Sequence, residues 1–169
     1  AVLLARNPDC KCGHCVLPSL FGESRAVRFY PKDYLISPVL AAYAVSEGMP
    51  ANINSMRIAA RYGLIAGMHW LRDLDPPCPW DSTVLYAAAE EGQLQVLQWM
   101  RDPVRVGGAC PVDKYVCDYA AAAGHLDCLS YLKSQNAPVS AETLNAAAEN
   151  DQLEIVTWLR SQDPPCPWN

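Results

Sequence analysis

The stretch STVLYAAAEEGQLQVLQWM at residues 82–100 combines two helical patterns. Its first half is rich in Ala, which has the highest helix propensity and lets neighbouring helices approach closely. In its second half Leu94, Leu97 and Met100 recur at helical spacing and form one apolar stripe. Gly92 lies between the two halves and is typical of a helix end. The stretch therefore predicts a pair of short helices joined by a tight turn.

The same pair of patterns recurs along the chain. Further Ala-rich segments are MRIAARYG, DYAAAAG and LNAAAEND, and an amphipathic segment with an aromatic residue follows each one. The aromatic residues recur at steps of 29, 32 and 27 residues, and they are Trp70, Trp99, Tyr131 and Trp158. The hexapeptide DPPCPW follows the first and the last of them. Because Pro ends helices, this hexapeptide is predicted to link consecutive helix pairs in a stack.

These periods predict an all-α chain that is organised as a helix-pair solenoid. We expect helix pairs near residues 52–74, 82–101, 114–134 and 141–161, with a preceding helix near 37–47. The corresponding repeat units are a half unit at 37–51 and full units at 52–80, 81–112, 113–139 and 140–168. Residues 1–36 show no repeat, so we expect them to form a separate N-terminal arm.

The repeat unit resembles the ankyrin repeat. In the unit quoted above, the residues on the core pattern of that family are Thr83, Leu85, Ala88, Ala89, Gly92, Leu94, Val96 and Leu97. The resemblance covers about residues 37–169, in a short variant with a Cys-Pro-Trp linker. Val84 and Tyr86 stand where the family usually has Pro and His. The resemblance implies a stack of helix pairs whose concave face binds another protein.

The linkers also contain cysteines, and their pattern indicates packing. Cys78, Cys110 and Cys166 occupy equivalent positions, but the other units have Ala137 and Met49 at the same phase. A position that accepts Cys, Ala and Met is an apolar packing position. We therefore expect these thiols to lie in the core and to bind no metal.

A different cluster of metal-ligating residues lies outside the repeats. Cys10, Cys12, His14 and Cys15 fall within six residues, and the spacing of Cys12 and Cys15 is that of a zinc knuckle. Structural zinc usually takes a second ligand pair from a distant segment, and the sequence shows no such pair. Two alternatives stay open, zinc at this cluster or thiols without metal. We expect no other cofactor.

Candidate partner-binding residues come from the groove phase of the repeat and from one insertion. The groove residues change from basic to acidic along the chain and are Arg61, Tyr62, Glu90, Glu91, Glu149 and Asn150. This trend favours a partner with a basic patch near the C-terminal units. The linker at 101–112 is three residues longer than the other Cys-containing linkers. Its residues Val104, Arg105 and Val106 are either a partner contact or a neutral variation in loop length.

Composition limits the classes of function. The net charge of −5 disfavours nucleic-acid binding, and no apolar run is long enough to cross a membrane. No nucleophile has a partnered base, so we expect no enzyme. We expect an intracellular, non-enzymatic scaffold that binds a protein partner. The alternative is an accessory subunit of a large, for example organellar, assembly that docks through the N-terminal arm.

Overall fold

The computed structural model describes residues 31–46, 48–102, 110–162 and 165–167. Within these residues it contains helices and no strand, which confirms the all-α prediction. The helices are α1 (Pro31–Leu35), α2 (Pro38–Ser46), α3 (Ile53–Arg61), α4 (Ile65–Arg72), α5 (Ser82–Glu90), α6 (Leu94–Arg101), α8 (Val116–Ala122), α9 (Leu126–Ser134), α10 (Ala141–Glu149) and α11 (Leu153–Arg160).

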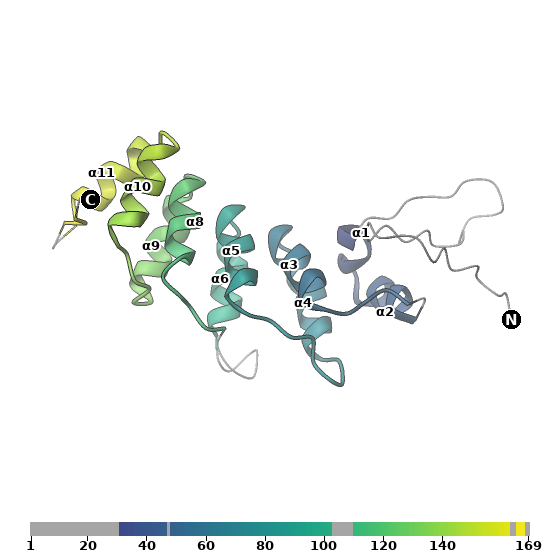
Figure 1. The fold of residues 1–169 in the computed structure, drawn as a ribbon. Helices are drawn as coiled ribbons and strands as arrows, with labels where there is room; N and C mark the ends of the chain where they lie inside the picture. Colours follow the sequence, from purple (N-terminus) through teal and green to yellow (C-terminus); the bar gives the residue numbers. More distant parts are fainter. Residues whose placement is uncertain (1–30, 47, 103–109, 163–164, 168–169) are drawn as a thin grey trace, which may run out of the picture.

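The helices follow one another along the molecule in chain order (Figure 1). Four pairs, α3–α4, α5–α6, α8–α9 and α10–α11, lie inside the four predicted ranges. The first helices of these pairs pack side by side, with α5 between α3 and α8, and α8 between α5 and α10. Among the second helices, α6 packs against α9. Neighbouring pairs therefore bury one another and share one continuous core.

The ends of the helices follow from local chemistry. The side chain of Asn52 accepts hydrogen bonds from the backbone N–H groups of Asn54 and Ser55, and that of Asp81 accepts one from Thr83. These bonds satisfy donors that the first turn of a helix leaves unpaired. At the other end of α5, Gly92 adopts a positive φ of 67°. The turn between the two helices of a pair needs this conformation, which Gly adopts without strain.

The last pair makes the same turn with a different residue. Asp151 is at the position of Gly92 and also has a positive φ, of 57°. Asp is one of the few non-glycine residues that tolerate this region. The turn geometry is therefore a property of the repeat, and the last unit achieves it with some backbone strain.

An additional helix pair precedes the four predicted ones. Helix α2 matches the helix expected near 37–47, but α1 was not predicted. Tyr34 and Leu35 of α1 are buried, and α1 packs against α2, α3 and α4. Sequence reasoning assigned these residues to the N-terminal arm. The boundary between the N-terminal arm and the repeats at residue 36 stays a prediction. Helix α1 precedes this boundary and nevertheless contributes to the core.

Each linker contains one residue that is bonded to the preceding helix. These residues are all buried, as the packing interpretation of the linker cysteines predicts, and they are Met49, Cys78, Cys110, Ala137 and Cys166. Each donates its backbone N–H to a carbonyl near the end of the preceding second helix, over 2.9 to 3.2 Å. The linker thus closes onto its own helix and delivers the chain to the next pair at a defined point.

An arginine holds three of these linkers from the side. Arg72, Arg101 and Arg160 donate through Nη1 to the carbonyl oxygens of Cys78, Cys110 and Cys166, over 2.9, 2.9 and 2.6 Å. In the remaining unit Lys133 occupies this position and donates to the side chain of Gln162 instead. The linker of that unit is shorter than the three linkers that contain Cys. We call the three arginine contacts the arginine clamps.

The repeated aromatic residues lie at the core but are not equally buried. Trp99 is buried, and its indole N–H donates to Nε2 of His69 over 2.7 Å. The rings of Trp80 and Trp99 meet edge to face at 5.8 Å. Trp70, Tyr131 and Trp158 are half-buried and pack against the edge of the core. The predicted core role therefore holds in full for Trp99 and in part for the other three.

Candidate functional site

The outward side of the first helices forms one surface, which we call the first-helix face. Side chains at positions i, i+3, i+4 and i+7 share one side of a helix. These positions hold Asn54, Arg57, Ile58 and Arg61 in α3, and Thr83, Tyr86, Ala87 and Glu90 in α5. They hold Tyr115, Asp118, Tyr119 and Ala122 at the start and in the body of α8, and Glu142, Asn145, Ala146 and Glu149 in α10. All of them except Ala87 are exposed or half-buried.

Three of the predicted groove residues meet in one ionic cluster. Arg61 of α3 pairs with Glu90 at 2.6 Å and with Glu91 at 3.4 Å. All three side chains are about half exposed, so solvent screens the pairs and each contributes roughly 0–1 kcal/mol. The cluster has a clearer electrostatic effect. The groove residues change from basic to acidic along the chain, and the cluster neutralises the basic end, because Arg61 is paired with carboxylates of the next unit.

The other predicted groove residues lie apart from this cluster. Tyr62 is half exposed at the end of α3, and the ammonium group of Lys32 lies 5.2 Å from the centre of its ring. Glu149 and Asn150 are exposed at the end of α10, where the Asn150 side chain donates to the carbonyl of Ala146. The acidic end of the trend therefore stays available to a partner.

Two sets of predicted site residues fall outside the described residues. They are the insertion residues Val104, Arg105 and Val106, and the metal-ligating candidates Cys10, Cys12, His14 and Cys15. Within the described part of the chain, no three His, Cys, Asp or Glu side chains come close enough to hold a metal ion. The zinc hypothesis for the N-terminal cluster stays a prediction.

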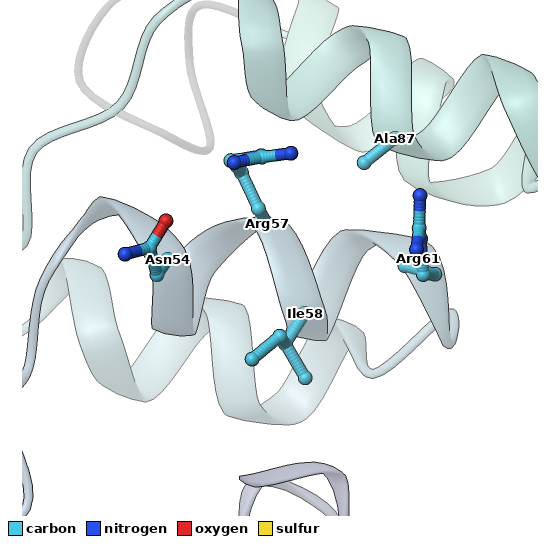
Figure 2. Close-up of a pocket in the computed structure, with 5 residues that line it drawn as sticks. All are labelled: Asn54, Arg57, Ile58, Arg61 and Ala87. Atoms are coloured by element: carbon cyan, nitrogen blue, oxygen red, sulfur yellow. The ribbon is translucent and has the colours of Figure 1, made fainter. Parts of the chain in front are cut away.

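A pocket that sequence reasoning did not identify opens between α3 and α5. It has a volume of about 210 Å³ and is lined by Asn54, Arg57, Ile58, Arg61 and Ala87. Figure 2 shows Arg57 and Arg61 extending from α3 toward the helix that carries Ala87. Because the side chain of Ala87 is small, it leaves space beside α5, and the two arginines line this space. The available signal was the pair of arginines four residues apart, which places both on one side of a helix.

Tyrosines and acidic side chains occupy the middle of the first-helix face. The rings of Tyr86 and Tyr119 stack, with their centres 4.8 Å apart. The hydroxyl of Tyr86 donates to the carboxylate of Asp113. The side chain of Thr143 donates to Asp118 over 2.6 Å. Tyr119 and Tyr115 nevertheless remain 42% and 48% exposed. This region is thus pre-ordered by the stack and still presents aromatic surface to solvent.

The acidic groups here have shifted pKa values with identifiable causes. Burial raises the pKa of Tyr86 to about 12, and the hydrogen bond to Asp113 adds to this effect. Burial alone would raise the pKa of Asp113, but hydrogen bonds from Tyr86 and from the backbone N–H of Tyr115 outweigh it and lower the pKa. Burial raises the pKa of Asp118, against the opposing hydrogen bond from Thr143. Each of these shifts therefore follows from burial and from hydrogen bonds within the network.

Comparisons of the chain with protein-family models, with curated proteins and with solved structures found no significant match. No helix in the described part of the chain is long and apolar enough to cross a membrane.

Proposed function

We propose that the chain is a non-enzymatic protein-interaction module, and that a protein partner binds across its first-helix face. In this proposal the helix pairs form an ankyrin-like solenoid, in which each unit contributes a few side chains to one extended surface. The exposed tyrosines in the middle of the face would supply contact area, and Glu149 at its end would attract a basic patch of the partner.

One observation carries the proposal, namely the contrast between the two sides of the first helices. At one inward position every unit has the same fully buried residue, and these residues are Ala59, Ala88, Ala120 and Ala147. Two positions earlier, on the outward side, every unit has a different residue, and these residues are Arg57, Tyr86, Asp118 and Asn145. Packing between helices restricts the inward position to a small side chain. The outward position has no such constraint, and its variety is that of a recognition surface.

The size of the pocket supports binding over catalysis. Sites for small molecules and cofactors typically enclose about 300–1,000 Å³. The pocket between α3 and α5 encloses about 210 Å³. A volume of this size suits one side chain of a partner.

The proposal is tested with peptides selected from a random library displayed on phage, using the full chain as bait. Tyr119→Ala should weaken the binding of the selected peptides to the chain about tenfold, because a rigid exposed aromatic ring is a typical hot spot. Gln98→Ala is the matched control, since Gln98 is exposed on α6, outside the first-helix face. Equal losses in both variants, or no selected peptide at all, would argue against the first-helix face as the binding surface.

A specific observation also favours the accessory-subunit alternative. Ile36, Val39 and Leu40 at the N-terminal end of the described part are 62%, 77% and 42% exposed. Large apolar side chains that are exposed and close together in the sequence favour a covered interface. A subunit that needs such a cover should self-associate when isolated, and Val39→Ser should reduce that association. A module should sediment as a monomer with or without the substitution.

A further inference from the structure

Charge in the pocket between α3 and α5 is unevenly distributed. Arg61 already has two carboxylate partners, Glu90 and Glu91. Arg57 borders the same pocket and is exposed, and within the described residues it has no ion pair. Two like charges four residues apart on a helix repel each other. Glu90 and Glu91 offset this repulsion at Arg61. An anion beside Arg57 would give its guanidinium the planar, two-point contact that carboxylates form with it.

We propose that this pocket takes the carboxylate side chain of an acidic segment in the protein partner. The carboxylate pairs with Arg57, and the amide of Asn54 at the rim supplies a further donor. The methylene groups of a Glu side chain contact Ile58 and Ala87. The inference rests on the proposed function and deepens it, because it names the chemistry that one part of the first-helix face recognises.

The charges around the pocket favour a carboxylate over a phosphate group. Two arginines and two glutamates gather there, so the local charge is close to balanced before the partner binds. A single negative charge can be accommodated by Arg57. A phosphate carries a charge of about −1.5 to −2 and would meet Glu90 and Glu91 at short range. The occupant is therefore expected to be Glu or Asp.

The experiment uses the peptides that the full chain selects from a random phage-displayed library. Wild-type selection should enrich Glu or Asp at one shared position. Replacing that acid by Gln in a synthetic peptide should weaken binding to the wild-type chain about tenfold, the cost of one charge-assisted contact. The same replacement should change binding to the Arg57→Gln chain by less than about twofold. Lys133→Gln is the matched control, because it removes one positive charge on α9, outside both the pocket and the first-helix face, and should behave as the wild type.

The outcomes separate the two proposals. Peptides that bind at Tyr119 but share no acidic residue would overturn the pocket assignment and leave the proposed function standing. The pocket assignment also fails if Arg57→Gln retains the full preference for the acid. Tighter binding of phosphoserine than of Glu at the shared position would contradict the choice of a carboxylate. If no library peptide binds any of the chains, the proposed function fails, and the pocket assignment fails with it.

Discussion

At the scale of single residues, the structure predicts that Trp99 contributes more to stability than Cys78, although both stand out in the sequence. Trp99 is buried, contacts Trp80 and donates to His69, so Trp99→Ala should lower the free energy of unfolding by about 3–5 kcal/mol. Cys78→Ala should cost about 1 kcal/mol, because Ala137 already occupies the equivalent position. Urea denaturation of both variants measures the difference. The packing account of the linker cysteines is wrong if Cys78→Ala is the more damaging change.

A second prediction at this scale concerns Gly92. A Cβ atom there would lie 2.7 Å from the ring of His125, whose Nε2 is 3.1 Å from the carbonyl of Glu90. Gly92→Ala adds a strained positive φ to this collision and should cost about 2 kcal/mol. Asp151→Gly is the control, because it changes the same turn in the last unit; we expect a shift within about 0.5 kcal/mol. Comparable urea midpoints for the two variants would show that His125 yields without cost.

At the scale of elements, the arginine clamps predict which linkers depend on a charged side chain. Arg101→Leu removes the hydrogen bond to the carbonyl of Cys110 and should lower the free energy of unfolding by about 1–2 kcal/mol. Lys133→Leu is the matched change in the unit without a clamp and should cost about 0.5 kcal/mol or less. Thermal or urea melts compare the two. A larger loss for Lys133→Leu would mean that the clamps add nothing to the linkers.

The elements also show how far the sequence could be read. The Ala-rich segments and the spacing of the aromatic residues predict the helix pairs, because both patterns record short-range packing that every unit repeats. Helix α1 was not predicted because its sequence PKDYL lacks the Ala-rich pattern, although Tyr34 and Leu35 are buried in the same core as the later units. The arginine clamps had a signal in WLRD, WMRD and WLRS, where Arg holds the same phase. The spacing of Arg57 and Arg61 indicates only that both lie on one side of α3, because the pocket itself depends on how closely α5 approaches α3.

At the scale of the whole molecule, buried thiols make stability depend on pH. Burial raises the pKa of Cys78 to about 11 and the pKa of Cys110, Cys117 and Cys128 to about 12, against 9.0 for an exposed thiol. The unfolded chain therefore releases these protons at lower pH than the folded chain. The contribution of each thiol is fully present below about pH 8 and is lost as pH rises from about 9 to the folded pKa.

The corresponding prediction compares pH 7 with pH 10. The free energy of unfolding should fall over this interval, by about 1.4 kcal/mol for each thiol whose pKa is near 12. Cys117→Ala removes one such thiol and should reduce the fall by that amount. Urea denaturation of the wild type and the variant at both pH values measures it. An identical fall in the two chains would show that Cys117 is not protected from ionisation in the folded state.

The paired anchors of the linkers have a consequence for how this molecule can change. The backbone bond from Cys110 to Met100 and the clamp from Arg101 hold the two ends of one linker, as the equivalent bonds hold the linker between Leu71 and Cys78. The bonded residues are 10 positions apart in the first case and 7 in the second. The longer linker thus keeps the same two bonds as the shorter one, so these anchors tolerate a difference of three residues in linker length. The linkers are therefore natural grafting points, where evolution or a protein engineer can add a segment without redesigning the core.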